Sequence, residues 1–501
     1  MAGRIRNSAV IVTWLFLASG AARAQGRGNA NWTTAGNDAQ RSSWVRTDAK
    51  ISVESLRQPG FQFLWKLGLA GQPTPMIVLD PYTGYRGHKS LGFLSGPSDD
   101  IYGIDIDLGL LEWHNRLATS IKPPANSTAA CPGGMTSSPA RPTAVAIQAT
   151  PAGRGGAVRS GPARGAVGEP NQGVATLLPA PTSSPAPRTA PVPTTASAPA
   201  VVRPNAVYAV TSDGMLQTMY VSNGADAAPP LPFLPPNAHA SGFIVVDNVA
   251  YVETDHSCGG VPNGVWALDL TTGQVTSWKS GAADMPGNAG AGPAFGSDGT
   301  LYVTSGNALT ALEPKTLQVR GSFRTGFNSS PVVFRFGERI LVAAATGDGR
   351  IFLLDSTDLN VALDKTAPGS NGFGFVPGAL TSWQDNAGTR WLLGAGNAAI
   401  MAWKVVDNDG PKLQPGWVLR NMLSPLPPIV VNGVVFAVAA GEYRSPAVLY
   451  ALDAATGKEL WNTGSTITSF VKSGGLSAGG SQIYLGTNDG TLYAFGFPME
   501  H

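Results

Sequence analysis

Charged residues are scarce in this chain. Lysine, arginine, aspartate and glutamate make up only 13% of the 501 residues, and the formal net charge is +2. Proteins that bind nucleic acid usually present a strongly basic surface, so this balance gives no reason to expect a nucleic-acid partner. Nucleophile and phosphate motifs are also lacking, because no G-x-S-x-G elbow, H-E-x-x-H pair or P-loop stands in a supporting context.

Cysteine is nearly absent too. The chain has two cysteines, Cys131 and Cys258, and no histidine spacing supports a two-cysteine metal site. The two residues can pair in an oxidising compartment, or they can remain free thiols. The sequence leaves both alternatives open.

Long apolar runs are missing except near the N-terminus. Arg4 and Arg6 precede the apolar stretch 9–19, which is short for a membrane span, and the tripeptide A-R-A at 22–24 matches a cleavage site. Residues 1–24 are therefore predicted to be a cleaved signal peptide, which would make the mature chain periplasmic or secreted. An uncleaved anchor is the alternative. No later stretch is long and apolar enough to span a bilayer.

Glycine and proline, by contrast, are plentiful, with 62 and 40 residues, and glycine helps to mark a repeated phrase. In each copy an apolar run ends at an acidic residue, a short turn ends at glycine, and a second run reaches tryptophan. Aspartate can bond the backbone that follows it, and glycine supplies the positive φ of a tight turn, so the phrase predicts a β-hairpin. The marker residues are Asp105, Gly109 and Trp113; Asp269, Gly273 and Trp278; Asp453, Gly457 and Trp461; and Asp355 in a degraded copy.

A second hairpin signal, the dipeptide Asp-Gly, occurs upstream of several copies. Two hairpins in series make a four-stranded antiparallel unit, and the units recur about every 45 residues, as propeller blades do. We predict an all-β protein that forms an eight-bladed β-propeller; seven blades are the alternative, because the second unit is poorly marked. The predicted blade cores are 73–118, 204–236, 243–281, 291–326, 328–366, 373–420, 424–464 and 466–498.

The two ends of the chain are predicted to meet. The last unit has no strand after its final turn, and residues 61–67 look like that missing strand. Pairing them would close the ring and remove its open edges. Tryptophans at fixed blade positions are expected to be buried between neighbouring sheets; these are Trp65, Trp113, Trp278 and Trp461.

Residues 119–203 interrupt the pattern. They are dominated by Ala, Pro, Gly, Ser and Thr and contain almost no aromatic residues, so they cannot bury enough apolar surface to offset their ordering entropy. We predict a disordered insertion between a first part, 25–118, and the remaining blades, 204–498. An inert tether is the favoured interpretation, and a wall-binding or partner-binding tail is the alternative.

The repeat resembles a known family. The phrase A-x-D-x-x-T-G-x-x-x-W at 451–461 is similar to the blade motif of PQQ-binding-like (quinoprotein-type) β-propellers, and the W-x-x-x-G-x-D sequence at 32–38 is similar to their opening segment. That family includes periplasmic dehydrogenases of alcohols or sugars, which hold PQQ on the propeller axis beside Ca²⁺, with an aspartate as general base. It also includes non-catalytic scaffolds that bind proteins.

The sequence departs from the dehydrogenase pattern. It has no adjacent cysteine pair to stack on PQQ, no recognisable set of Glu, Asn and Asp ligands for Ca²⁺, and no C-x-x-C-H haem motif. We therefore expect a binding or scaffold module without catalysis, acting as a monomer on a protein or small-molecule ligand at a propeller face. A PQQ-dependent oxidoreductase is the alternative, with PQQ and Ca²⁺ as its cofactors.

One polar cluster stands out inside a blade. Glu253, Asp255 and His256 lie close to Cys258, and such side chains can bind a transition metal. The functional interpretation is a pocket or metal site at the mouth of the propeller channel; the favoured alternative is a solvated loop between two strands. The acidic residues from Asp99 to Asp107 resemble Ca²⁺ ligands, but a turn role is favoured for them.

Overall fold

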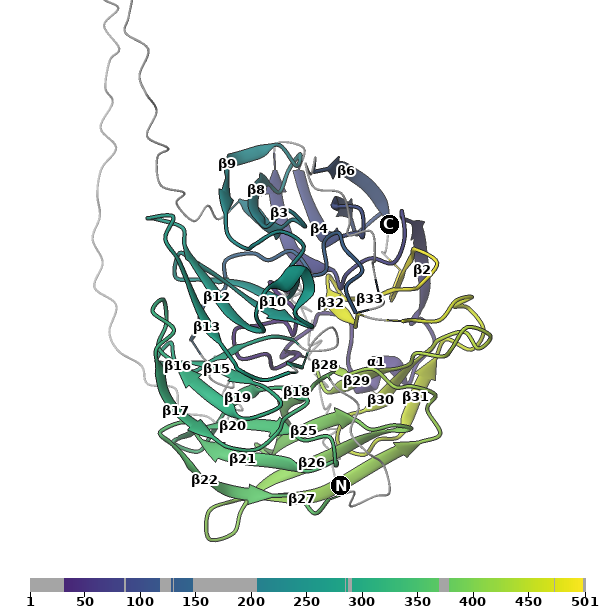
Figure 1. Cartoon of the computed structure of the whole chain (residues 1–501). Coiled ribbons are helices and arrows are strands. Elements are labelled where there is room, and N and C mark those ends of the chain that lie inside the picture. Colours follow the sequence, from purple (N-terminus) through teal and green to yellow (C-terminus); the bar gives the residue numbers. More distant parts are fainter. Residues whose placement is uncertain are drawn as a thin grey trace, which may run out of the picture.

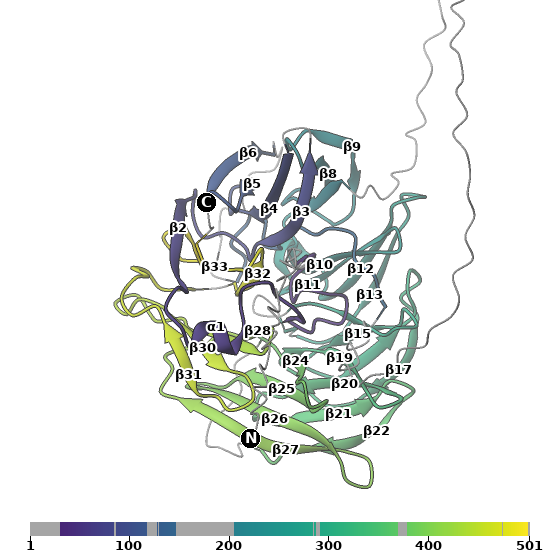
Figure 2. The same cartoon turned by 180° about the vertical axis from the view of Figure 1, so that it is seen from behind.

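The protein is a ring of eight small β-sheets around a central axis (Figures 1 and 2). The computed structural model describes residues 31–84, 87–117, 128, 130–146, 205–283, 285–286, 291–368, 378–472 and 474–498. The expected signal peptide, 1–24, lies outside these residues. No helix in the described part of the chain has the length and apolar character needed to cross a membrane.

Each sheet is one blade, and its strands are ordered from the axis outward. Blade 1 contains β3 (Ile77–Gly84), β4 (Gly87–Ser95), β5 (Asp100–Asp105) and β6 (Leu110–Arg116); blade 2 contains β7 (Ala206–Val210), β8 (Met215–Tyr220) and β9 (Asp226–Pro232). Blade 3 contains β10 (His239–Val246), β11 (Val249–Asp255), β12 (Gly264–Asp269) and β13 (Val275–Lys279); blade 4 contains β14 (Ala294–Phe295), β15 (Leu301–Thr304), β16 (Leu309–Leu312) and β17 (Val319–Phe323).

The second half of the ring has the same plan. Blade 5 contains β19 (Val332–Phe336), β20 (Arg339–Ala345), β21 (Ile351–Asp355) and β22 (Asp358–Lys365); blade 6 contains β24 (Thr381–Gln384), β25 (Arg390–Ala395), β26 (Ala399–Asp407) and β27 (Pro411–Arg420). Blade 7 contains β28 (Ile429–Val431), β29 (Val434–Ala439), β30 (Val448–Asp453) and β31 (Glu459–Asn462); blade 8 contains β32 (Ser477–Gly479), β33 (Gln482–Gly486), β34 (Thr491–Gly496) and β2 (Gln62–Gly68). The remaining elements are β1 (Trp44–Val45), the parallel pair β18 (Ser329–Ser330) and β23 (Gly378–Ala379), the helix α1 (Val53–Leu56) and the 3₁₀ turn Cys258–Gly260.

Burial explains the apolar strands. Blades pack face to face, so both faces of an inner strand are covered, and strands such as β10 and β29 are buried at every residue. In outer strands such as β13 and β17, by contrast, exposed residues largely alternate with partly buried ones. The near-continuous apolar runs of the sequence therefore mark the inner strands, as expected for sheets covered on both sides.

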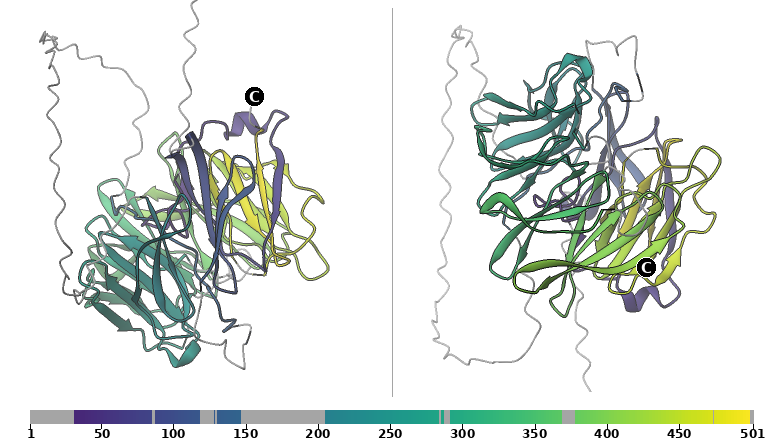
Figure 3. Two further views of the ribbon diagram at one scale, coloured as in Figure 1. Left: turned by 90° about the horizontal axis from the view of Figure 1, so that it is seen from above. Right: turned by 60° about the horizontal axis from the view of Figure 1, so that its bottom comes forward.

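The predicted closure of the ring is confirmed. Strand β2 pairs antiparallel with β34, so an N-terminal strand completes the C-terminal blade. Figure 3 shows this purple strand beside the yellow strands of blade 8. Eight blades are present, and the alternative of seven is wrong.

Blade 2 explains why the second unit was hard to recognise. Its sheet has three strands, and Ala140 forms an isolated bridge with Tyr208 at the inner edge, where the other blades have a fourth strand. Residues 130–146 fall within the predicted disordered insertion, yet several of them, including Met135 and Ser138, are buried in the ring. The expectation of disorder is therefore wrong for this stretch; residues 147–203 lie outside the described part.

The marker aspartates start turns. Oδ1 of Asp105, Asp269, Asp355 and Asp453 accepts backbone N–H groups two or three residues downstream. The turn glycines Gly109, Gly273 and Gly457 have φ between 68° and 73°, the left-handed region that favours glycine. The aspartate and the glycine of the repeated phrase therefore form the turn of each hairpin, as predicted.

The tryptophans are less uniformly buried than expected. Trp113 is 8% exposed and donates its indole N–H to the Val221 carbonyl of blade 2. The expectation is too strong for Trp65, Trp278 and Trp461, which are only partly buried. They lie on outer strands, where the blades diverge and solvent reaches the rim.

Candidate ligand site on the propeller axis

The N-terminal residues 32–45, here called the axial segment, run across the inner strands of the ring. Carbonyls of residues 39, 40, 42 and 43 accept the backbone amides of Phe295, Val333, Ser382 and Val430, which belong to blades 4, 5, 6 and 7. At its start the segment pairs with blade 1 through Trp32 and Val78. The sequence opening that resembles the quinoprotein family is therefore a chain that ties successive blades together.

Arg41 ties the axial segment to one further blade, blade 3, and adds a second contact with blade 4. Its side chain is fully buried, and it donates hydrogen bonds to the carbonyls of Gly242 in blade 3 and Pro293 in blade 4. It also bonds the hydroxyl of Thr34 and the carbonyl of Ala35. Burial lowers the pKa of this guanidinium to about 10, so the group still carries its charge at neutral pH.

A second stretch, residues 130–146, is here called the inserted segment. It bonds blade 1 through Ser138 and Pro75, and blade 3 through Thr143 and Val245. It also meets the axial segment, because the Arg141 amide donates to the Thr33 carbonyl. Together the two segments occupy the region where the inner strands converge.

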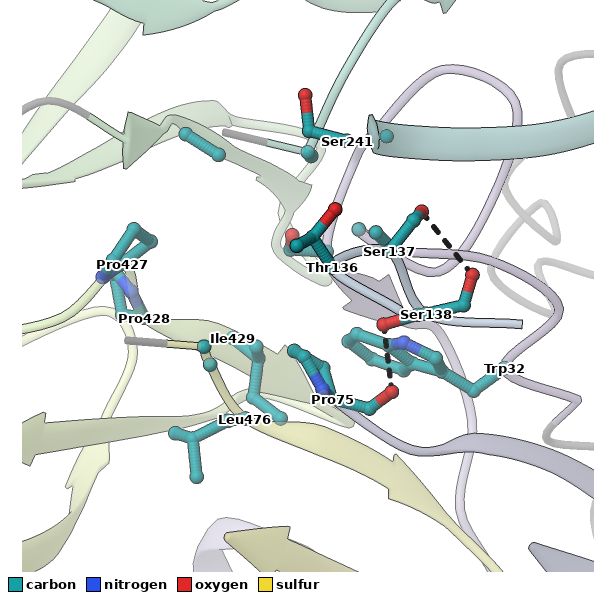
Figure 4. A pocket seen from close by; sticks show the side chains of 18 residues that line it. Trp32, Pro75, Thr136, Ser137, Ser138, Ser241, Pro427, Pro428, Ile429 and Leu476 are labelled. Atoms are coloured by element: carbon teal, nitrogen blue, oxygen red, sulfur yellow. Dashed lines mark hydrogen bonds between the residues drawn. The ribbon is translucent and has the colours of Figure 1, made fainter. Parts of the chain in front are cut away.

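Little space is left on the axis. The axial cavity has a volume of about 90 Å³ and is lined by both segments and by the inner edges of blades 1, 3, 4, 6, 7 and 8. Figure 4 shows its wall, where Trp32 lies beside Ser138, which hydrogen-bonds to Pro75. Ligand pockets typically measure about 300–1,000 Å³, so this cavity is too small for an organic cofactor.

A larger cavity, here called the mouth cavity, opens beside it. Its volume is about 780 Å³, and loops from blades 1, 6, 7 and 8 line it together with the inserted segment and His239. Met135, Leu426 and Val471 contribute apolar surface. The mouth cavity is therefore the part of the axis with space for a ligand.

The polar cluster predicted from the sequence does not line this cavity, and it is not a solvated loop. Glu253 and Asp255 are both 1% exposed on β11, whereas the side chain of His256 is 36% exposed. The favoured interpretation is therefore wrong for the two acids. Alternation along the strand places both carboxylates on one face of blade 3.

The residue that joins this cluster to the cavity is His239, which sequence reasoning missed. Its Nδ1 lies 2.5 Å from Oδ1 of Asp255, and its ring, only 2% exposed, lines the mouth cavity. The pairing follows from register, because His239 and Asp255 are opposite each other on β10 and β11. A polar residue that opens an apolar strand was the only sequence signal.

Glu253 is unusual because its two carboxyl oxygens have no hydrogen-bond partner among the described residues. Burial and repulsion by Asp255 raise its pKa to about 8, and attraction by Arg41 opposes that rise only in part. Glu253 is therefore mainly protonated at neutral pH.

Cys131 and Cys258 form a disulfide. The bond joins the inserted segment to the turn after β11, directly beside His239. Of the alternatives that the sequence left open, the free thiols are therefore excluded. The bond also removes Cys258 as a metal ligand.

The other acidic candidates serve the scaffold. Asp99 accepts hydrogen bonds from Ser212 and so links blade 1 to blade 2, and Asp100 pairs with His114 and Arg116. The interactions with His114 and Arg116 hold the pKa of Asp100 below its ordinary value despite its burial. These acids point to neighbours in the fold and do not converge on one another.

Comparison with known proteins agrees with this architecture. A family model described as outer membrane protein assembly factor BamB matches residues 414–496, whereas no curated protein matches the sequence. The quinohemoprotein alcohol dehydrogenase from Comamonas testosteroni superposes with a TM-score of 0.57 at 13% identity, covering 96% of this chain and 82% of that one. BamB from Moraxella catarrhalis gives 0.50 at 11% identity, covering 88% and 99%.

This chain shares its β-propeller fold with these two proteins. A europium-containing methanol dehydrogenase is also similar, with a TM-score of 0.55 at 12% identity over 94% of this chain and 98% of that one. Similarity at identities this low establishes only the fold that this chain shares with these proteins. They do not carry over an activity.

The described residues of this propeller do not fit a Ca²⁺ ion of the kind expected beside PQQ. Ca²⁺ takes about six to eight oxygen ligands, usually including carboxylates, but no aspartate or glutamate among the described residues lines the axial or the mouth cavity. Within the described ranges, no three His, Cys, Asp or Glu side chains gather as a metal-binding group. The donor chemistry for Ca²⁺ is therefore not supplied by these residues.

Proposed function

We propose that this protein is an exported, non-catalytic binding module that uses its mouth cavity to hold a ligand. The observation that carries the proposal is the filled axis. The axial and inserted segments leave about 90 Å³ where the related dehydrogenases are expected to hold PQQ, whereas about 780 Å³ is open at the mouth. Export to the periplasm or beyond would fit the disulfide and the predicted signal peptide.

The second candidate function is that of a PQQ-dependent oxidoreductase acting on alcohols or sugars. It is favoured by the overall similarity to the two dehydrogenases, which extends over nearly the whole chain. The mouth cavity is also large enough for an organic cofactor. The lack of carboxylates in its lining argues against this candidate.

A reconstitution experiment separates the two candidates. The purified protein is mixed with PQQ and Ca²⁺, and reduction of an artificial electron-accepting dye is followed with methanol, ethanol and glucose. We expect no dye reduction above that of PQQ and Ca²⁺ without protein. Reduction that needs protein, PQQ, Ca²⁺ and substrate together would establish the oxidoreductase and overturn the binding module.

A further inference from the structure

We infer that the mouth cavity recognises a carboxylate group, which is held by His239 and Lys472. This inference rests on the proposed binding function and gives its ligand a chemical class. The ligand would carry the carboxylate on a neutral, partly apolar body.

One side of the His239 ring is occupied by an acid. Asp255 is buried, and its Oδ1 lies 2.5 Å from Nδ1 of His239. Nε2 is then the nitrogen available to a ligand. Either ring nitrogen of a histidine can carry a proton, so Nε2 can donate a hydrogen bond to a carboxylate.

The chemistry of the lining supports an anionic ligand. Of the described residues around the cavity, the ionisable ones are His239 and Lys472, and none is a carboxylic acid. The side-chain amides of Asn397 and Asn488 add neutral donors, and Leu426 is among the residues that offer apolar contact. A carboxylate entering this space meets groups that can carry positive charge and no fixed negative charge.

The groups that face His239 come from blade 3 and from the inserted segment. Asp255 faces it from β11, and the ring of His256 lies 5.5 Å from it, edge to face. The inserted segment brings Pro132, Gly133 and Thr136 to this wall, so it adds no ionisable side chain there. Glu253 is largely neutral near pH 7 because burial raises its pKa to about 8. Among the described residues, Asp255 is thus the acid in direct contact with the His239 ring.

Two sources could supply such a carboxylate: a small organic acid or the C-terminus of a peptide. The test uses succinate and its diamide, and the acetylated peptide Ala-Ala-Ala as free acid and as amide. Binding is measured by calorimetry from pH 5.5 to pH 8.5, and the histidine side chains are followed by nitrogen-15 NMR. Only five histidines need to be assigned.

We expect at least one free acid to bind and to shift the His239 imidazole signal, while its amide does neither. His239→Gln should weaken binding about tenfold or more, because a hydrogen bond to the charged carboxylate is lost, and Lys472→Gln should weaken it less, because that side chain is exposed. Asp255→Asn tests a positioning role and should reduce the shift that the ligand causes in the His239 imidazole signal.

His114→Gln is the matched control, because His114 also pairs with a buried aspartate but lies outside the cavity. Preference for succinate identifies a small acid, and preference for the peptide acid identifies a C-terminus. If acids and amides bind equally, or if no acid shifts His239 at millimolar concentration, the inference is wrong. Neither result affects the proposed function, which only substrate-dependent dye reduction would overturn.

Discussion

At the residue scale, the unexpected feature is a pair of buried ionisable groups from distant parts of the chain. Arg41 lies in the axial segment and Glu253 in blade 3, and both are buried. The guanidinium is satisfied by four oxygen acceptors, three of them backbone carbonyls, whereas the carboxyl group has no such partner in the described residues. Arginine can keep its charge under burial, and the glutamic acid instead stays protonated.

This asymmetry predicts a pH-dependent stability. The folded pKa of Glu253, about 8, exceeds the ordinary value of 4.5, so between these values the unfolded chain has lost a proton that the native protein keeps. The contribution of Glu253 to the free energy of unfolding is therefore fully present below about pH 4.5 and declines as the pH rises toward 8. We expect Glu253→Gln to abolish that decline and to be more stable than the parent by a few kcal/mol at pH 8.5, since each pKa unit corresponds to about 1.4 kcal/mol.

Urea denaturation of both proteins at several pH values from 4.5 to 8.5 measures this difference. If the free energy of unfolding of the variant and of the parent changed with pH in the same way, the raised pKa of Glu253 would be contradicted. Asp213→Asn is a suitable control, because Asp213 lies in an Asp-Gly turn that bonds Thr211 and is not deeply buried.

At the element scale, the repeated phrase encodes contacts between blades as well as hairpins. The indole N–H of Trp417 bonds the Ala454 carbonyl, and its ring covers Gly457 of the next blade. In the same way, the indole N–H of Trp65 bonds the Ile106 carbonyl, and the ring covers Gly109. Blade 2 has no tryptophan on β9, and a Cβ at Gly273 in the following blade would meet nothing within 4 Å. The turn glycine therefore receives a neighbour's tryptophan only where one is present.

A matched pair of substitutions tests this second role. Gly457 and Gly273 have φ values of 71° and 73°, so alanine at either position costs about 1–2 kcal/mol from backbone strain. At Gly457 the new methyl group would also lie 2.5 Å from Trp417, and overpacking of this kind typically adds about 1–3 kcal/mol. We expect Gly457→Ala to lower the unfolding free energy more than Gly273→Ala in chemical denaturation. Equal losses would show that the tryptophan contact adds nothing.

At the scale of the whole molecule, the repeats made the ring predictable. Marker residues such as Asp269 and Asp453 set a local hairpin, and the period of those hairpins fixed the blades and the closing strand around Trp65. The axial and inserted segments could not be found in this way. Their hydrogen-bond partners lie in up to six blades. A segment that bonds one residue to each blade in turn does not show the alternation of apolar and polar residues that marks a strand. His239 was missed for a related reason, because its role depends on register with Asp255.

The inserted segment also completes the ring in a way that can be tested. It contributes the bridge of Ala140 to Tyr208 at the inner edge of blade 2, and its disulfide anchors it to blade 3. Replacing both Cys131 and Cys258 by serine should leave the blades formed, because their ladders and the closing strand do not involve the disulfide.

The inserted segment, however, would be held only by scattered hydrogen bonds, and loss of a native disulfide typically costs about 2–5 kcal/mol. Hydrogen exchange should therefore show faster exchange of the Ala140 and Thr143 amides, with β11 and β12 still protected. Unchanged protection of Ala140 would mean that backbone bonding alone holds the segment in place, whereas lost protection throughout blade 3 would mean that the disulfide stabilises the blade itself.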